Sequence, residues 1–499
     1  MDYIIVLAIL IISLVLISKR SKDSLHMIQL EEYNSDNYRK WIQNNKDRAY
    51  GFGKDKQPVK KPLVFTQRAT RLYIANMLIS GVLILLPIVA YGIFESIWIS
   101  SSILIVAFLV YEFQPNTMLL ANIIMAPVER NINQGFYDSA QSKIKERDDL
   151  TVVGITGSFG KTSTKFIIGT ILEEKYKVLN TPESYNTPMG LSKVINNDLN
   201  DDHEVFIAEM GAREIGEIKE VAELCQPKIG VITSIGPVHI ETFRNIDNIM
   251  KTKYELIDEL PADGIAIFNY DNEYVKKMAD KTFKEKILYG LEDIEDLDIY
   301  ADDIVVSELG STFTLRDKNG NSVSCTTRLL GKHNIYNILA GACVAISLGF
   351  SFEEISRGIS KIEPIPHRLN IIDSGTGVIV IDDAFNSNPI GTKAALDVIS
   401  QFKEGRKIIV TPGMIELGAM EEEENRKFGI NIGKVCDYVI LVGENRTKPI
   451  YQGLMEVNYN PDNIFVVNNL DEATERLGRI TRPKDVVLFE NDLPDNYNE

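Results

Sequence analysis

The sequence predicts an α/β protein with parallel, doubly wound sheets, preceded by about three transmembrane helices. Two patterns carry this prediction. From about residue 150 onward, short β-branched runs alternate with turns and helix-like stretches, and before residue 115 the chain holds three long runs without charge. Alternation of strand and helix is typical of βαβ units. The 499 residues suffice for about three domains at roughly 150 residues each.

Composition excludes several classes of protein. Hydrophobic residues make up 44% and charged residues 25% of the chain, as in ordinary globular proteins. Acidic residues outnumber basic residues by 70 to 53, and the net charge of −17 argues against nucleic acid as a partner. The four cysteines are scattered without a CxxC spacing, so we expect neither a disulfide framework nor a zinc site.

The three uncharged runs predict membrane spans at about residues 3–20, 72–94 and 96–113. Tyr3–Ser18 has sixteen residues, Leu72–Phe94 has twenty-three and Ser96–Tyr111 has sixteen, and only Glu95 separates the last two. For the first run the alternative is a cleaved signal peptide, which Asp2 and the following Lys19-Arg20 disfavour. For the other two runs the alternative is a pair of buried helices in a soluble domain.

The segment between the first two runs, residues 21–71, is locally basic. Residues 22–71 hold eleven Lys or Arg against six acidic residues. The positive-inside rule places this loop and everything after Tyr111 in the cytoplasm. We therefore expect a multi-pass protein of the cell membrane with cytoplasmic catalytic domains. The basic loop is also a candidate for contact with anionic membrane lipid, although a role in topology alone explains it equally well.

Seven β-branched runs predict the strands of the remaining chain: 151–155, 205–208, 229–232, 264–268, 378–382, 407–410 and 438–442. Residues 293–330 differ, because alternation and the turn Asp317–Gly320 predict a small antiparallel excursion. Prolines near residues 362–366 predict a domain boundary. We expect a membrane region at 1–115, a linker at 116–148, a central domain at 149–362 and a C-terminal domain at 363–499.

A phosphate loop follows the first of these strands. The segment GITGSFGKTST, residues 154–164, precedes a helix-like stretch, and glycine amides there can turn toward phosphates. The spacing departs from the general Walker pattern, because Ile155 occupies one of its glycine positions. The alternative is a chance Gly-Lys-Thr turn. The predicted ATP-binding residues here are Gly157, Ser158, Gly160, Lys161, Thr162 and Ser163.

Further motifs follow the phosphate loop in order. They are TPESYNTPMG (181–190), FIAEMGAREIGEI (206–218), VHIE (238–241) before KTKYEL (251–256), GKHNIYN (331–337), DDAFNSNP (382–389) and MIELG (414–418). Together with the loop they resemble the Mur ligase family, and within it the MurF type, over roughly residues 149–450. The resemblance implies a P-loop central domain with a parallel sheet and a Rossmann-like C-terminal domain.

The resemblance implies an ATP-dependent, ADP-forming amide ligase of cell-wall peptide synthesis. In this family a carboxylate becomes an acyl phosphate, and an amine then displaces the phosphate. The acceptor would be a UDP- or lipid-linked muramyl peptide and the donor an amino acid or dipeptide, D-Ala-D-Ala by resemblance. The predicted spans stand where MurF-type ligases have their UDP-binding domain. The resemblance therefore does not indicate whether the acceptor is linked to UDP or to a lipid.

The resemblance also assigns site residues. Lys161, His239 and Lys253 are the catalytic candidates, with Lys253 carbamylated. Two magnesium ions are expected, with Thr162, Glu209 and His239 as ligands. Asn334, Arg368 and Asp383 are expected to contact ATP, and Asn186, Thr187 and Arg213 to contact the substrate.

Several residue assignments have alternatives. Glu209 also fits an ordinary position near a helix N-cap, and Asn334 fits a helix cap. Lys251 rivals Lys253, Asp382 rivals Asp383, and Arg368 also fits a surface salt bridge.

Two other functions remain possible at this stage. One is a ligase for another envelope polymer, such as a polyglutamate-like capsule. The other is a non-catalytic ATP-binding subunit of an envelope complex. The intact set of Lys161, Thr162, Glu209, His239 and Lys253 disfavours the second, because a decayed site would normally have lost at least one of them.

Overall fold

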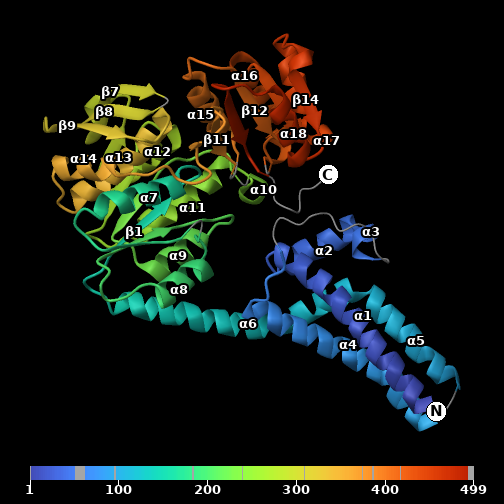
Figure 1. The fold of residues 1–499 in the computed structure, drawn as a ribbon. Coiled ribbons are helices and arrows are strands. Elements are labelled where there is room, and N and C mark those ends of the chain that lie inside the picture. The colour runs from blue at the N-terminus through green and yellow to red at the C-terminus, as the bar shows by residue number, and fades with distance from the viewer. Residues whose placement is uncertain are drawn as a thin grey trace. The chain divides into compact units, whose positions relative to one another are not determined.

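The computed structural model describes residues 2–50, 62–94, 97–182, 185–238, 240–307, 309–373, 375–384, 387–415 and 417–492. The chain forms two compact units, one of helices within residues 1–135 and one of α/β structure within residues 136–493 (Figure 1). Helix α6 (Gln114–Lys145) runs from the first unit into the second. The residues predicted to form a linker therefore include a long helix.

The helical unit contains α1 (Asp2–Leu30), α2 (Ser35–Asn44), α3 (Lys46–Ala49), α4 (Gln67–Phe94), α5 (Ile97–Glu112) and the first part of α6. Ile17, Ile84 and Val110 pack together from α1, α4 and α5. A buried polar network also joins these helices, because the Asn76 amide donates to Ser21 Oγ at 2.7 Å and to Gln114 Oε1 at 2.8 Å. Residues 21–71 were predicted to be a basic loop, but α1, α2, α3 and α4 include many of them.

The prediction of a multi-pass membrane protein is wrong. Among the residues that the structure describes, one helix, Gln67–Val89, is long and apolar enough to cross a membrane, and one pair bent by 72° at residue 113 passes the same test together. The first run continues as helix α1 through Lys19, Arg20, Lys22 and Asp23, and the third is a helix of only 16 residues. The topology and the lipid partner, both inferred from three spans, lose their basis.

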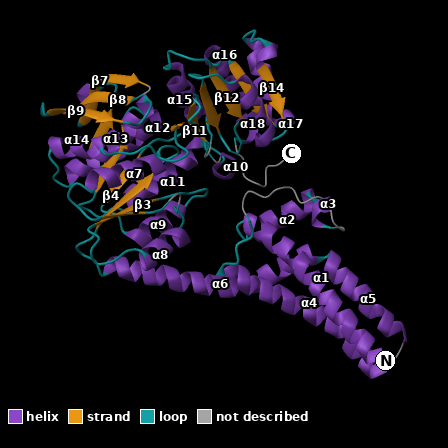
Figure 2. Cartoon of the chain, viewed as in Figure 1, coloured by secondary structure: helices purple, strands orange, loops and turns teal. Residues whose placement is uncertain are grey.

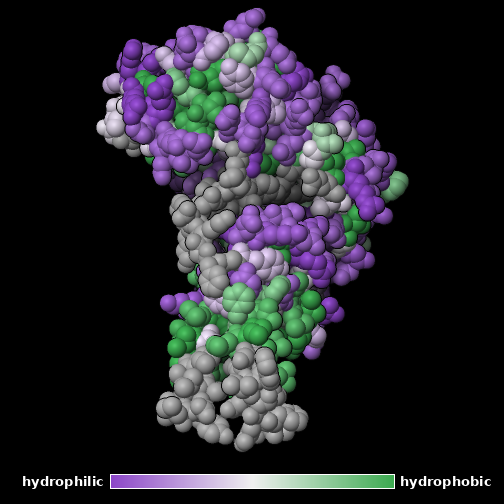
Figure 3. Space-filling model, turned by 90° about the vertical axis from the view of Figure 1, so that its right-hand side faces the viewer, coloured by the Kyte–Doolittle hydropathy of each residue, from purple (hydrophilic) through white to green (hydrophobic). Residues whose placement is uncertain are grey.

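Apolar side chains are nevertheless exposed on the helical unit, as the green surface in Figure 3 shows. Leu78 is 64% exposed and Leu86 is 62% exposed on α4, while Ile105 of α5 is 59% exposed. Leu72 on the same α4 is only 3% exposed, because it packs in the cluster with Leu25 and Met118. One helix therefore has a buried and an exposed apolar face.

A nine-stranded sheet forms the first half of the α/β unit, in the order β2-β3-β1-β4-β5-β6-β7-β8-β9. The strands from β2 to β7 pair in parallel, and β7, β8 and β9 pair antiparallel. The bounds are β1 Thr151–Thr156, β2 Val178–Asn180, β3 Val205–Glu209, β4 Ile229–Ile232, β5 Ile265–Asn269, β6 Glu285–Gly290, β7 Ile299–Ser307, β8 Gly310–Asp317 and β9 Ser322–Thr327. The predicted antiparallel excursion is confirmed.

Helices cover both faces of this sheet (Figure 2). Val153 and Ile155 of β1 belong to the cluster formed with α7, α13 and α14, whereas Val152 belongs to the cluster formed with α8, α9 and α11. Burial on both faces explains why the parallel strands read as continuous apolar runs. The helices are α7 Lys161–Leu172, α8 Pro188–Asn197, α9 Glu217–Cys225, α10 Ile240–Phe243, α11 Ile246–Asp258, α12 Glu273–Lys281, α13 Lys332–Ser347 and α14 Phe352–Ser360.

A second sheet of six strands follows, in the order β10-β11-β15-β12-β13-β14, with only β10 antiparallel. Its elements are β10 Asn370–Asp373, β11 Ile379–Asp383, α15 Pro389–Ser400, β12 Lys407–Thr411, α16 Glu421–Val435, β13 Tyr438–Val442, α17 Glu444–Glu456, β14 Ile464–Val467, α18 Leu470–Ile480 and β15 Val486–Glu490. All seven predicted strands are present, and the predicted α/β class is confirmed. The central β15 was not predicted.

Candidate active site

The phosphate loop connects β1 to α7 at the carboxyl edge of the first sheet. Gly157 has φ of 154°, and a Cβ there would stand 2.1 Å from Thr233 Oγ1. Gly160 has φ of 80° and precedes the first residue of α7. Both positions therefore require glycine. Ser158 Oγ donates to the Gly236 carbonyl at 3.0 Å, and Lys161 Nζ donates to the Gly157 carbonyl at 2.8 Å.

Glu209 lies at the end of β3, next to β1, and its carboxylate is 1% exposed. Oε1 accepts from Thr162 Oγ1 and from Asn186 Nδ2, both at 3.1 Å. Oε2 accepts from Lys165 Nζ at 3.1 Å, and the Lys165 side chain is completely buried. The structure thus brings together three residues predicted from the sequence, Thr162, Asn186 and Glu209, with one that was not predicted.

Lys253 of α11 is buried and close enough to Lys161 for their charges to interact. Burial lowers the pKa of Lys253 to about 7, the Lys161 charge lowers it further, and Glu217 and Glu255 oppose this shift. Burial also lowers the pKa of Lys161, while Glu209 raises it. Lys251, the rival of Lys253, is an exposed residue. The predicted His239 lies outside the described residues.

Asn334 and Asn337 lie on α13, and Asn337 joins this helix to α7, the helix that follows the phosphate loop. Asn337 Nδ2 donates to Asn334 Oδ1 at 3.1 Å, and Asn337 Oδ1 accepts from Thr164 of α7 at 3.1 Å. Asn334 Nδ2 donates to the Leu330 carbonyl at 2.9 Å. Both polar atoms of the Asn334 side chain are therefore engaged within the protein. Both residues belong to the motif at 331–337, and of the two only Asn334 was predicted to contact ATP.

Arg368, two residues before β10, and Asp383, at the end of β11, line the same cavity as the phosphate loop. This cavity has a volume of about 320 Å³ and is lined by, among others, Gly160, Ser163, Asn334, Arg368 and Asp383. Burial raises the pKa of Asp383 against the opposing charge of Arg368. Asp382, its rival, instead contacts His367 Nδ1 at 2.7 Å. Five of the residues predicted to bind ATP thus line one cavity.

Glu490 at the end of β15 stands opposite Asp383 in the parallel pair of β11 and β15. Its carboxylate is 1% exposed and accepts from Ser387 Oγ at 2.8 Å. Burial, reinforced by the Asp383 charge, raises the pKa of Glu490 well above its ordinary value. Sequence reasoning missed this residue, because the last fifty residues contain no recognisable motif.

Two predicted substrate residues have other contacts in the structure. The Thr187 hydroxyl accepts from the Gly190 amide at 3.2 Å and so caps the N-terminus of α8. The Arg213 side chain is exposed, and its backbone amide donates to Glu217 at 2.6 Å. Asn186 alone of the three reaches Glu209. The structure therefore does not bring Thr187 and Arg213 to the cluster around Glu209 by any described contact.

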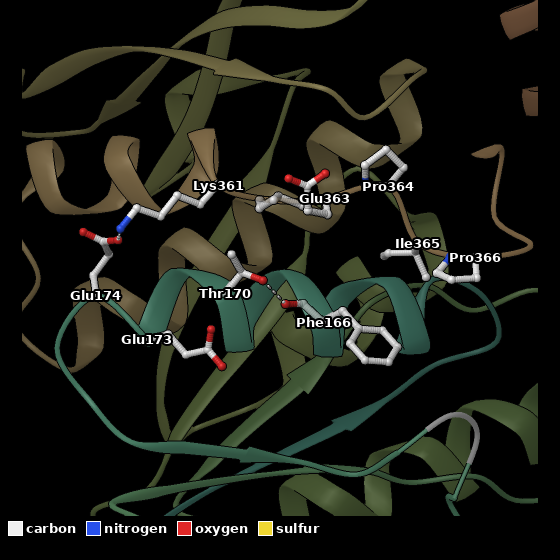
Figure 4. A pocket seen from close by; sticks show the side chains of 10 residues that line it. Phe166, Thr170, Glu173, Glu174, Lys361, Glu363, Pro364, Ile365 and Pro366 are labelled. Carbon is white, nitrogen blue, oxygen red and sulfur yellow. Dashed lines mark hydrogen bonds and ion pairs between the residues drawn. The ribbon is translucent and has the colours of Figure 1, made fainter. Parts of the chain in front are cut away.

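A second hollow of about 550 Å³ lies beside the other end of α7. Figure 4 shows it between α7 and residues 361–366, with Lys361 extended toward Glu174 and the Thr170 hydroxyl bonded to the Phe166 carbonyl. Phe166, Pro364, Ile365 and Pro366 form its apolar side. None of the residues predicted to act in the site lines this hollow.

The donor atoms at the phosphate loop suit magnesium. Thr162 and Glu209 offer a hydroxyl and a carboxylate 3.1 Å apart, and magnesium prefers hard oxygen ligands together with substrate phosphates. Within the described ranges no group of three or more His, Cys, Asp or Glu side chains could hold a metal ion by itself. The Thr162 hydroxyl and the Glu209 carboxylate therefore fit an ion that also binds the phosphates of a nucleotide.

A phosphate loop at the edge of one parallel sheet, facing polar groups from a second sheet, is the architecture of a nucleotide-dependent enzyme with two α/β domains. Comparison with known proteins narrows that class. Residues 155–345 match the model of the Mur ligase middle domain, and residues 367–490 match that of the Mur ligase glutamate ligase domain. The chain belongs to the Mur ligase family, so the predicted family is confirmed.

Several similar proteins are UDP-N-acetylmuramoyl-tripeptide–D-alanyl-D-alanine ligases by name. The UDP-N-acetylmuramoyl-tripeptide–D-alanyl-D-alanine ligase of Mycobacterium leprae is 30% identical over 68% of this chain and 70% of that protein. The ligase of the same name from Buchnera aphidicola is 32% identical, and the match covers 56% of this chain and 59% of the relative. The MurF ligase of Thermotoga maritima, solved in complex with ADP, superposes with a TM-score of 0.64 at 25% identity, over 72% of this chain and 80% of that one.

Proposed function

We propose that this chain is an ATP-dependent, ADP-forming amide ligase of the MurF type. It would join the amine of D-Ala-D-Ala to the terminal carboxylate of a muramyl tripeptide. The observation that carries the proposal is the cavity that Gly160 and Ser163 of the phosphate-loop motif line together with Arg368, just before β10, and Asp383, at the end of β11. The names of the relatives from Mycobacterium leprae and Buchnera aphidicola support the choice of substrates.

The residues of the phosphate loop would bind and orient ATP. The loop amides and the N-terminus of α7 attract the phosphates, and the Lys161 ammonium would leave the Gly157 carbonyl for the transferring phosphate. Gly157, Ser158, Gly160 and Ser163 shape the loop, and Asn334, Arg368 and Asp383 would contact the rest of the nucleotide. Thr162 and Glu209 would hold magnesium, which when bound neutralises charge on the phosphates.

We propose that the side chain of Lys253 becomes a carbamate and so changes from a cation to an anion. With a pKa of about 7, a large share of its side chain is the neutral amine at cellular pH. A neutral amine can add carbon dioxide and release a proton, which turns a buried cation into a carbamate anion. This anion would support a second magnesium ion, together with His239. The buried position of Lys253 beside Lys161 favours that charge reversal, because it removes a repulsion.

Asn186, Thr187 and Arg213 remain the candidates for substrate contact. Asn186 is the strongest of them, because it already bonds to Glu209. We propose that residues 149–362 and 363–499 act as the ATP-binding and C-terminal domains. The N-terminal residues lie outside both family matches, so the family assignment does not say which group the muramyl peptide is linked to. A UDP-linked acceptor is part of our proposal.

The test offers full-length protein ATP, magnesium, UDP-muramyl tripeptide and D-Ala-D-Ala, and reads the products by mass spectrometry. A tripeptide extended by the dipeptide, with stoichiometric ADP, is the expected result. The Lys161→Ala variant is the control and should form both products at a rate lower by about 10²–10³-fold. Extension with a different amine only would replace the dipeptide in the proposal, and ATP binding without any extension would contradict ligase activity on this acceptor.

A further inference from the structure

Lys165 is a buried cation that the phosphate loop itself does not need. It lies four residues after Lys161 and three after Thr162, so all three share one face of α7. Its side chain is 0% exposed, and its ammonium stands 3.1 Å from Glu209 Oε2 and 4.7 Å from the ring centroid of Phe166. A charge taken completely out of water requires a compensating partner.

The two oxygens of Glu209 have different partners. Oε2 faces Lys165, whereas Oε1 faces Thr162 and Asn186, both at 3.1 Å. Thr162 belongs to the phosphate loop, so Oε1 is the oxygen on the side where a nucleotide's metal ion would bind. Lys165 therefore fixes which carboxylate oxygen turns toward that ion, and it also cancels the negative charge of the carboxylate.

We propose that Lys165 is a positioning residue that keeps the Glu209–Thr162 site neutral, so that a divalent cation binds there only together with ATP. The inference rests on the proposed function and deepens it. A carboxylate already neutralised by a buried ammonium attracts a second cation weakly, and the triphosphate supplies the missing negative charge. The same neutralisation lets the ion leave with ADP, which turnover requires.

The inference is tested with manganese, which prefers the same oxygen ligands as magnesium and is visible by electron paramagnetic resonance. Wild-type full-length protein should bind Mn²⁺ at least about tenfold more tightly with a non-hydrolysable ATP analogue than without it. Lys165→Met should bind one Mn²⁺ without nucleotide, because Glu209 then lacks the cation paired with its Oε2. The double variant Lys165→Met/Glu209→Gln should lose that nucleotide-free site again.

Thermal unfolding distinguishes two roles of Lys165, which are positioning Glu209 for a metal ion and only stabilising the fold. Lys165→Met should lower Tm by on the order of 5–10 °C without metal, because the buried Glu209 carboxylate loses its ion-pair partner, and Mn²⁺ should recover most of that loss. Lys175→Met is the matched control. It removes a half-buried lysine paired with Glu354 at 2.6 Å, so a small loss that Mn²⁺ does not change is expected.

Two results would overturn the inference. The first is that the wild type binds Mn²⁺ as tightly without the ATP analogue as with it. This measurement needs only the wild type, so it decides the question even if Lys165→Met does not fold. The other is a folded Lys165→Met whose loss of stability is the same with and without Mn²⁺. Lys165→Arg keeps the charge and should behave as the wild type. A wild type that binds no ATP analogue at all would instead overturn the proposed function.

Discussion

The two units of this chain differ in where their apolar side chains lie. In the α/β unit every residue of strands β3 and β4 is buried, and apolar clusters lie on both faces of the sheet. In the helical unit, Leu78 and Leu86 of α4 are more than 60% exposed, while Leu72 of the same helix is buried. The comparison teaches that an apolar run shows that an element exists, but not what covers its faces.

The largest expected effect tests the chemistry assigned to the α/β unit. Lys161→Ala removes the cation that we propose to contact the transferring phosphate, so ADP formation should fall by about 10²–10³-fold. The measurement is the rate of ADP release with saturating substrates. Lys177→Ala, which removes an exposed lysine paired with Asp202 at 3.3 Å, is the control and should keep the full rate. Undiminished ADP formation by Lys161→Ala would remove the phosphate loop from the proposed site.

The sequence predicted the α/β unit in detail because its signals are local. The run Ile229–Ile232 and the turn after it predict a strand without any knowledge of its neighbours, and Gly157 and Gly160 mark a loop whose backbone only glycine tolerates. The final strand β15 was missed although it lies in the centre of its sheet. Strand order depends on pairing between distant residues, which no local pattern contains.

The residues missed at the site have the same explanation. Lys165 reads as an ordinary helical lysine, and only the fold brings it to Glu209, 44 residues away. Glu490 joins Ser387 across 103 residues. In the helical unit three spans were predicted from the lengths of uncharged runs, whereas among the described residues one helix, Gln67–Val89, is long and apolar enough to cross a membrane by itself, and α5 has only 16 residues.

The next prediction concerns the buried polar network of the helical unit. Gln114 accepts from Asn76 at 2.8 Å and donates to Ser80 at 2.9 Å. Gln114→Leu leaves buried polar groups without these partners and should destabilise the helical unit by about 1–3 kcal/mol. Denaturant unfolding, followed by the fluorescence of the two tryptophans, Trp41 and Trp98, measures the loss. If the two units are independent, ADP formation stays unchanged, whereas a parallel loss of activity would show that they are coupled.

A pH titration of Lys253 comes third. Its pKa in the folded chain is about 7, against 10.5 for an ordinary lysine, so the folded state releases the proton first. Between these two values the unfolded chain holds more protons, and the contribution of Lys253 to stability therefore rises with pH and is lost as pH falls through 7.

Carbamate formation should follow the same titration. Carbon-13 NMR with labelled carbon dioxide should show a carbamate signal that grows several-fold from about pH 6 to about pH 8, as the neutral amine becomes dominant. Lys253→Met should lack the signal, and Lys251→Met, which removes the exposed neighbour on the same helix, should keep it. A signal that persists in Lys253→Met would place the modification elsewhere.

The smallest expected effect sharpens the comparison within one helix. Leu78→Ala changes a side chain that is 64% exposed and should alter stability by less than about 0.5 kcal/mol, whereas Leu72→Ala, at 3% exposure, should cost about 2–5 kcal/mol. Both substitutions remove the same atoms from α4, so helix propensity cancels in the difference. Urea unfolding of the two variants measures it. A cost for Leu78→Ala as large as that for Leu72→Ala would mean that another molecule or segment covers the exposed apolar face of α4 in the folded protein. The two units would then differ in what covers their apolar side chains and not in how exposed these side chains are.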